Sequence, residues 1–304
     1  MRIVVHGQQA FGKSVLEALL ERGEDVVAVY CAPDREGRPL DPIKELALEK
    51  NLTVYQPSSY SDDEVCDELR SLAPDLVVMA YVTLFVREEF LNIPTYGTIQ
   101  YHPSLLPLHR GPSSINWPII KGSEKTGLSI FWPDNGLDTG PVLLQKEVDI
   151  KEDDTLGSLY FNELFPLGVE AMLESVDLVR DGNAPKIVQD ESQATYESWC
   201  KKKDVEIDWS APTEETYNLI RGANPQPGAW TTHEGQTLKI FDCVKCSEVT
   251  GNPGEILSID NEGLVVATGD GGICIQRVRP EGAGKMSAQE YISMHQLKIG
   301  GRLG

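Results

Sequence analysis

The sequence predicts an α/β fold class: a Rossmann-like, mainly parallel sheet, followed by a smaller β-rich, OB-like barrel domain at the C-terminus. Apolar runs of strand length alternate with helical patterns up to residue 150, as is typical of a parallel sheet. Short β-type runs separated by tight turns follow residue 205, as is typical of a small barrel. We therefore expect two domains, 1–185 and 205–304, joined by an aperiodic linker at 186–204.

The N-terminal elements alternate in type from the first residues. Buried-type apolar runs predict strands, and amphipathic runs that end at glycine predict helices. The expected strands are 2–6, 26–31, 53–55, 75–80, 97–101 and 128–132, and the expected helices lie near 11–21, 41–50, 62–72 and 87–90. The stretch GQQAFG at residues 7–12 departs from the spacing G-x-G-x-x-G, so the sequence favours a plain strand-to-helix turn over a dinucleotide site.

The second half of the chain changes from helical to β-type patterns. A helical pattern covers 155–180, with an interruption near 166–168, and a further helix is expected near 213–221. Ser287 and Glu290 have the spacing of a capping box and predict a short final helix. The expected short strands are 238–244, 254–259, 264–268 and 273–278.

Charge and hydropathy exclude several classes of function. The 304 residues include 27 Lys and Arg against 47 Asp and Glu, a net charge of −20, and the only dense basic run, at 201–203, is favoured as a solvated linker. This balance disfavours binding to a nucleic-acid backbone, which depends on basic residues. No apolar run is long enough to span a membrane and no basic leader precedes a hydrophobic one, so we expect a cytoplasmic protein without a membrane partner.

The six cysteines are scattered and are expected to be free thiols. Cys243 and Cys246 form a C-x-x-C pair, but a zinc site needs two more ligands and only His233 lies nearby. No metal site is therefore expected. The sequence gives no indication of the oligomeric state.

Two ionisable residues lie among glycine and proline, each after an apolar strand. His102 stands in YHPSLLP, and Asp138 follows it by 36 residues in NGLDTGP. Placed at the same sheet edge, a histidine and a carboxylate form a proton-transfer pair. Each feature taken alone is more often structural than catalytic.

An ordered set of motifs resembles the formyltransferase superfamily that uses 10-formyltetrahydrofolate. The N-terminal motifs are YHPSLLP with His102, Arg110-Gly111 and GLDTG with Asp138, and the C-terminal motifs are EIDW, IR and PGAW at 206–209, 220–221 and 227–230. The run from YHPSLLP through SINW, SIFW, GLDTG and LLQKE looks most like the hydrolase domain of 10-formyltetrahydrofolate dehydrogenase, and the chain is also similar to methionyl-tRNA formyltransferase. The resemblance implies the formyltransferase fold and no metal.

The resemblance also implies a mechanism and a folate pocket. Asp138 would remove a proton from the nucleophile or polarise water, and His102 would hydrogen-bond the developing oxyanion or relay a proton. Many superfamily transferases have Asn two residues before this histidine, whereas this chain has Gln100, whose extra methylene changes the reach of the amide. The folate-binding residues that the resemblance implies are Tyr81, Ser104, Leu105, Leu106, Pro107, Gly136 and Leu137.

The expected activity is removal of the formyl group from 10-formyltetrahydrofolate by hydrolysis or by transfer to a small amine. The larger dehydrogenase continues beyond the point where this chain stops, so we expect no oxidation of the formyl group. The alternative is a methionyl-tRNA formyltransferase, which the net charge and the lack of a basic insertion after the second strand disfavour. A second alternative, suggested by Gln100, is a folate-binding sensor with weak catalysis.

Overall fold

The computed structural model describes residues 1–304 and contains two compact units. Unit 1 comprises residues 1–114, 127–148 and 162–197, and unit 2 comprises residues 115–126, 149–161 and 198–304. The domain limits that we expect from the sequence stay a prediction.

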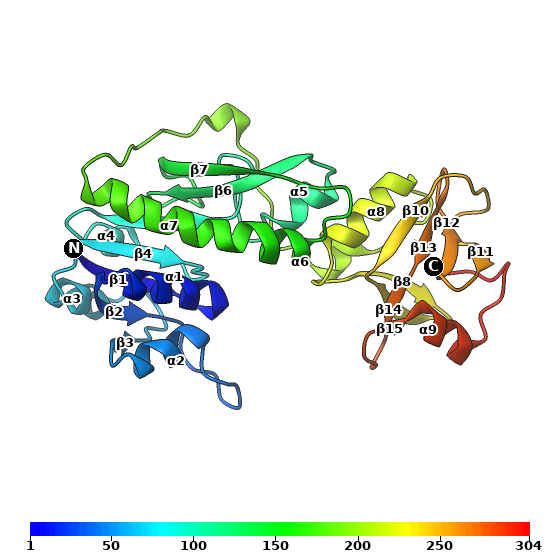
Figure 1. Cartoon of the computed structure of the whole chain (residues 1–304), viewed down its shortest axis with the longest axis horizontal. Helices are drawn as coiled ribbons and strands as arrows, with labels where there is room; N and C mark the ends of the chain where they lie inside the picture. The colour runs from blue at the N-terminus through cyan, green and yellow to red at the C-terminus, as the bar shows by residue number, and fades with distance from the viewer. The chain divides into compact units, whose positions relative to one another are not determined.

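A seven-stranded sheet forms the centre of unit 1 (Figure 1). Its order is β3-β2-β1-β4-β5-β6-β7, with parallel pairing from β3 to β5 and antiparallel pairing between β5 and β6. The mainly parallel sheet that the sequence predicts is thus confirmed. The strands are β1 (Arg2–Gly7), β2 (Asp25–Tyr30), β3 (Thr53–Tyr55), β4 (Leu76–Ala80), β5 (Thr98–His102), β6 (Lys125–Phe131) and β7 (Val142–Asp149).

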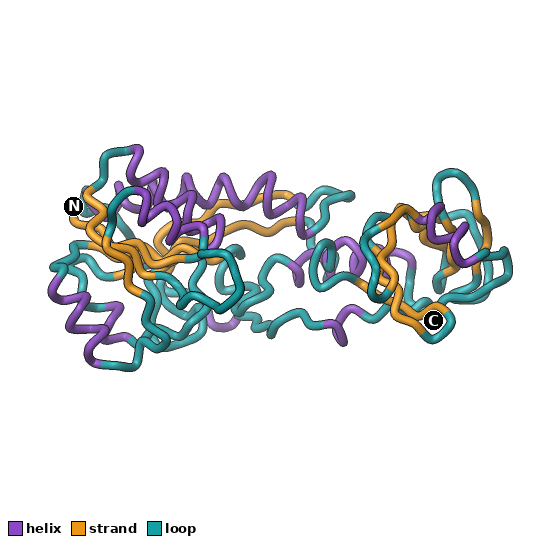
Figure 2. The backbone as a smooth tube through the Cα atoms, turned by 90° about the horizontal axis from the view of Figure 1, so that it is seen from below, coloured by secondary structure: helices purple, strands orange, loops and turns teal.

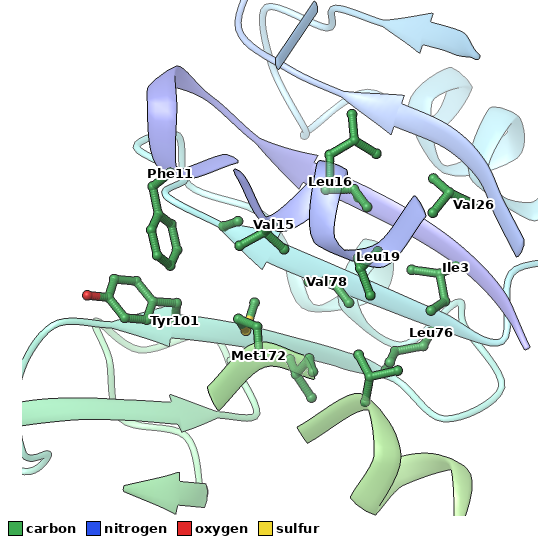
Figure 3. Packing of buried hydrophobic residues seen from close by; sticks show 14 of the residues in the cluster. Ile3, Phe11, Val15, Leu16, Leu19, Val26, Leu76, Val78, Tyr101 and Met172 are labelled. Carbon is green, nitrogen blue, oxygen red and sulfur yellow. The ribbon is translucent and has the colours of Figure 1, made fainter. Parts of the chain in front are cut away.

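Helices cover both faces of this sheet, because alternate strand residues point to opposite sides. On one face, α1 (Gln9–Glu21), α2 (Pro42–Glu49) and α7 (Phe165–Arg180) bury a stripe of side chains that includes Leu16 and Met172. Figure 3 shows the ring of Phe11 beside that of Tyr101 in this core.

The opposite face of the sheet carries α3 (Asp63–Ser71) and α4 (Glu88–Leu91). Their apolar side chains pack with Tyr30 and Tyr60. His6 is buried in the same cluster, where its Nε2 lies 2.7 Å from the hydroxyl of Tyr60. Helices thus cover both faces of the sheet, which explains why apolar strands alternate with amphipathic helices in the sequence.

The long helical pattern at 155–180 is three elements in the structure. They are α6 (Leu156–Leu159), a π-helical turn (Tyr160–Leu164) and α7. Pro166 lies in the first turn of α7, where its missing N–H breaks no helical hydrogen bond. The pattern is therefore interrupted by a change of helix type at 160–164, and the interruption expected at 166–168 is wrong, because these residues lie within the continuous helix α7.

Unit 2 holds two four-stranded antiparallel sheets, with the orders β10-β13-β12-β11 and β15-β14-β9-β8. Figure 2 shows how strands and loops alternate in this part of the chain. Their strands are β8 (Ala229–His233), β9 (Gln236–Ile240), β10 (Cys243–Cys246), β11 (Ile256–Ile259), β12 (Leu264–Ala267), β13 (Gly272–Ile275), β14 (Arg277–Pro280) and β15 (Met286–Ser287). The β-rich C-terminal part is confirmed, whereas the closed OB-like barrel stays a prediction.

Two of the expected strands, 238–244 and 273–278, each divide between the two sheets. The chain bends at Asp242, whose carbonyl oxygen accepts hydrogen bonds from the backbone N–H groups of Gln276 and Arg277. Each run therefore supplies one strand to each sheet, as chains do at the corners of β-structures. The remaining helices are α5 (Asn116–Ile120), α8 (Thr213–Gly222) and α9 (Ala288–His295), and two 3₁₀ turns lie at Glu191–Gln193 and Lys202–Val205. None of the helices has the length and apolar character needed to cross a bilayer.

Candidate active site

His102 and Asp138 lie close together in the structure. His102 is the last residue of β5, and Asp138 lies in the loop between β6 and β7. The reason expected for their proximity, two strand ends at one sheet edge, is wrong, because β6 runs antiparallel to β5 and Phe131 at its end pairs with Gln100. The loop after β6 instead returns to His102 and delivers Asp138 there.

The two side chains are buried and face each other at a short distance. Nδ1 of His102 lies 3.7 Å from Oδ2 of Asp138, and less than a tenth of either side chain is exposed. Nε2 of His102 donates a hydrogen bond to the backbone carbonyl of His109 at 3.0 Å, because a carbonyl oxygen can only accept. The ring is thereby held with Nδ1 toward the carboxylate.

The Asp138 carboxylate is held by the backbone. The N–H of Gly111 donates to Oδ2 at 2.8 Å. Gly111 has a φ of 108°, and a Cβ at this position would collide with the carbonyl oxygen of Glu197. Glycine is therefore required for this N–H to reach the carboxylate. Asp138 itself has a φ of 56°, in the left-handed region that costs most residues about 1 kcal/mol or more.

A buried polar network fixes the backbone of the Asp138 loop. The Nε2 group of Gln189 donates to the carbonyl oxygens of Asp138 and Gly140, at 2.9 and 2.6 Å. The Oε1 atom of Gln189 accepts from the guanidinium of Arg110, at 3.2 and 2.8 Å. Arg110 is fully buried and also donates to Glu191 and Tyr196. Residues 189–196, part of the segment we expect to be a linker, thus support the Asp138 loop and Arg110, in the segment that follows His102.

The Ser-Leu-Leu-Pro turn is fixed by a serine from β6. The Ser129 hydroxyl donates to the carbonyl oxygen of Ser104 at 2.7 Å and accepts from the N–H of Leu106 at 3.0 Å. Ser104 and Leu106 are buried, so their side chains hold the turn, whereas Leu105 and Pro107 are half-buried. The hydroxyl of Ser104 donates to the carbonyl oxygen of Leu108 at 2.7 Å.

Gln100 lies two residues before His102 on β5, so both side chains are on the same face of the sheet. It is half-buried, and its side-chain amide has no hydrogen-bond partner within the chain. Because the Gln100 amide has no partner within the chain and lies beside His102, it is available to donate a hydrogen bond to a bound molecule. This property agrees with the oxyanion role implied for Gln100.

The other implied folate residues border the same region. Tyr81 directly follows β4, the strand next to β5, and has a φ of 64° with 45% of its surface exposed. Gly136 and Leu137 belong to the Asp138 loop and are exposed, Leu137 to 56%. Strained or exposed residues of this kind are common where ligands bind. Their contact with folate stays a prediction.

Sequence reasoning missed Gln189 and Ser129 because no short motif contains them. Gln189 lies in an aperiodic stretch, and Ser129 lies in the middle of an apolar strand. A signal for Ser129 exists, since a serine inside a run of buried apolar residues needs hydrogen-bond partners. Gln189 carries no comparable signal in the sequence.

Two surface hollows lie in unit 2. One, of about 510 Å³, is lined by Met286, Gln289 and Met294, and another, of about 440 Å³, by Glu152, Tyr217 and Lys245. Neither contains a paired acid and base in the geometry of His102 and Asp138.

Family models match both parts of the chain. The formyl transferase model covers residues 1–175, and the model of the formyl transferase C-terminal domain covers residues 200–296. The mitochondrial 10-formyltetrahydrofolate dehydrogenase of Mus musculus is 38% identical over 98% of this chain, which spans only 34% of that larger protein. The methionyl-tRNA formyltransferase of Geobacter sulfurreducens is 38% identical over 100% of this chain and 97% of its own length.

Solved structures share the fold at low sequence identity. HypX from Aquifex aeolicus in complex with tetrahydrofolic acid is 21% identical with a TM-score of 0.71, over 98% of this chain and 48% of that chain. The N-formyltransferase from Helicobacter canadensis, in complex with folinic acid and dTDP-3-aminofucose, is 19% identical with a TM-score of 0.68, over 93% of this chain and 99% of that one. These likenesses support the fold.

Proposed function

Because the chain belongs to the formyltransferase family, we propose that it removes the formyl group from 10-formyltetrahydrofolate at His102 and Asp138. The observation that carries this proposal is the buried pair itself, with Nδ1 and Oδ2 3.7 Å apart and each side chain fixed by a backbone hydrogen bond. A positioned acid and base of this kind contribute about 100- to 10,000-fold to a rate.

In the proposed reaction, the proton that leaves the nucleophile is returned to the leaving group. A nucleophilic amine or water attacks the formyl carbon and gives a proton to the Asp138 carboxylate, whose Oδ1 is not used by the Gly111 N–H. The same carboxylic acid then returns this proton to N10 of the folate as the bond between carbon and N10 breaks, while the His102 ring, whose Nδ1 faces the carboxylate, stabilises its charge. The gap of 3.7 Å is too long for a direct hydrogen bond, as is common before substrate is bound.

Gln100 completes the proposed site as a donor to the formyl oxygen. Negative charge grows on this oxygen during attack, and a preorganised donor stabilises it. Gln100 shares its sheet face with His102 and makes no hydrogen bond within the chain. Its amide is therefore free to serve the oxyanion.

Two sets of observations bear on which molecule accepts the formyl group, and they favour different acceptors. The match over the whole length of methionyl-tRNA formyltransferases supports methionyl-tRNA, the alternative of our sequence expectation, more strongly than the main expectation. The net charge of −20 and the likeness to formyltetrahydrofolate dehydrogenases support the second candidate, hydrolysis or transfer to a small amine. The cytoplasmic location stays a prediction.

The test mixes purified protein with 10-formyltetrahydrofolate and follows the release of tetrahydrofolate. The reaction is run alone, with charged initiator tRNA, and with small primary amines. Release only with tRNA supports the methionyl-tRNA assignment, and release without an acceptor or with a small amine supports the second candidate. An absence of release under every condition contradicts the proposed activity.

A further inference from the structure

A second cluster of ionisable side chains lies in unit 2, where the turn after β8 meets the end of α9. His233 is the last residue of β8, Glu234 follows it, and His295 is the last residue of α9. One ligand atom of each residue lies within 4.8 Å of those of the other two. We propose that His233, Glu234 and His295 bind a divalent transition-metal ion of the zinc type.

The backbone fixes two of the three ligands relative to each other. β8 and β9 pair His233 with Gln236, so their turn consists of Glu234 and Gly235 alone. Both turn residues have positive φ, 51° and 78°, as a two-residue type I′ hairpin requires. Glu234 therefore lies at a defined position directly beside His233, and its exposed side chain retains the freedom to close on an ion.

Tyr291 orients the His233 ring from the neighbouring helix. Its hydroxyl lies 2.7 Å from Nδ1 of His233, which leaves Nε2 for a metal. Histidine ligands of metals are typically held in this way by a second hydrogen bond on the other ring nitrogen. The Tyr291 ring also lies 4.3 Å from that of His295, measured between centroids, so one side chain contacts both histidines.

The electrostatic environment favours a cation. The Glu234 carboxylate supplies negative charge beside the two imidazoles. His295 stands at the C-terminus of α9, where the helix dipole places partial negative charge. Two imidazoles and one carboxylate are a ligand set that zinc uses in proteins, with the fourth position left to water.

The cysteines of unit 2 do not belong to this cluster. Cys243 and Cys246 are free thiols, and neither joins the group of side chains that could hold an ion. Burial raises the pKa of the Cys246 thiol and raises that of Cys274 to about 11, so both stay protonated near neutral pH. The protonated thiol is the form that does not bind metal.

The test is calorimetric titration of Zn²⁺, and separately Ni²⁺, into the tag-free full chain after treatment with a chelator. We expect one equivalent to bind and to raise the melting temperature. His233→Ala and His295→Gln should each weaken binding by about 100-fold or more, and Tyr291→Phe by about 10-fold. Each variant is first shown to keep the wild-type circular dichroism and metal-free melting temperature, and His295→Gln serves if His233→Ala fails to fold.

The matched controls are Glu262→Gln, an exposed carboxylate elsewhere in unit 2, and Cys246→Ser. Both should bind the ion as the wild type does. Absence of saturable binding overturns the proposal, and so does binding that survives in a folded histidine variant or is lost in Cys246→Ser.

Discussion

Gln189 should control the position of Asp138, although it is buried and is not one of the proposed catalytic residues. Its side chain gives two hydrogen bonds to the carbonyls of Asp138 and Gly140 and accepts two from Arg110. Loss of the two neutral bonds costs about 1 kcal/mol each, and loss of the bonds to the guanidinium about 1.5 kcal/mol more. Gln189→Ala should therefore lower the free energy of unfolding by about 3.5 kcal/mol.

The same substitution should lower kcat, because the Asp138 loop loses its support. A displacement of about 1 Å at a reacting group costs about 100-fold in rate. We expect a fall of about 10- to 100-fold in kcat for tetrahydrofolate release, with KM for the folate little changed, since Gln189 is buried and its amide is bonded within the chain. Urea denaturation and steady-state kinetics measure the two effects.

Two further variants separate positioning from stability. Gln189→Glu keeps an acceptor for Arg110 but loses the donor to Asp138 and Gly140, so kcat should fall as in Gln189→Ala while more stability is retained. Gln193→Ala, an exposed glutamine of the same segment, should match the wild type in both assays. Wild-type kcat in a folded Gln189→Ala protein would refute the positioning role.

Two other predictions concern the oxyanion donor and acid stability. Gln100→Ala should lower kcat by about 100- to 1000-fold. If the Gln100 amide reaches too far to serve the oxyanion well, Gln100→Asn should raise transfer to an amine relative to hydrolysis. Unchanged rates and product ratios in both variants would remove Gln100 from the mechanism. Burial lowers the pKa of His6 to about 3, from 6.5 in the unfolded chain. Between pH 6.5 and 3 the unfolded state therefore binds a proton that the folded state does not. The free energy of unfolding should fall as the pH falls through this range. Between pH 7 and 5 the wild type should lose about 2 kcal/mol more than His6→Asn in urea denaturation, and parallel losses in the two proteins would contradict a neutral buried His6.

The local patterns of the sequence predicted most of the sheet. The five parallel strands and the helices between them follow from apolar periodicity, which a sheet with two covered faces imposes on each residue. The direction of β6 could not be predicted in this way, because a buried strand has the same pattern whether it runs parallel or antiparallel. For that reason the proximity of His102 and Asp138 was correct but its expected cause was wrong.

β7 shows a different limit of periodicity. Its first residues are buried, but Gln145, Lys146 and Glu147 alternate in exposure because β7 lies at the edge of the sheet. Charged residues in an edge strand weaken the apolar signal. The bend at Asp242, which divides two expected strands between sheets, likewise depends on long-range hydrogen bonds that no local pattern records.

Part of the candidate site could likewise be predicted from the sequence, and part could not. Sequence motifs identified His102, Asp138 and Gly111. These motifs are recognisable because a close approach between two backbone segments, or an unusual turn, requires glycine. The supporting Gln189 makes contacts 49 to 79 residues away along the chain, and its identity follows from the carbonyls it reaches and from Arg110. Such a residue is found only when the tertiary structure is known.

The most direct test of the proposed chemistry is the turnover of Asp138→Asn. The asparagine keeps an oxygen for the Gly111 N–H and nearly the same volume, so the fold and the folate affinity should stay close to those of the wild type. It lacks the carboxylate that receives the nucleophile's proton, so release of tetrahydrofolate from 10-formyltetrahydrofolate should fall by about 1000-fold or more with every acceptor. A folded Asp138→Asn protein that releases tetrahydrofolate at the wild-type rate would contradict the account.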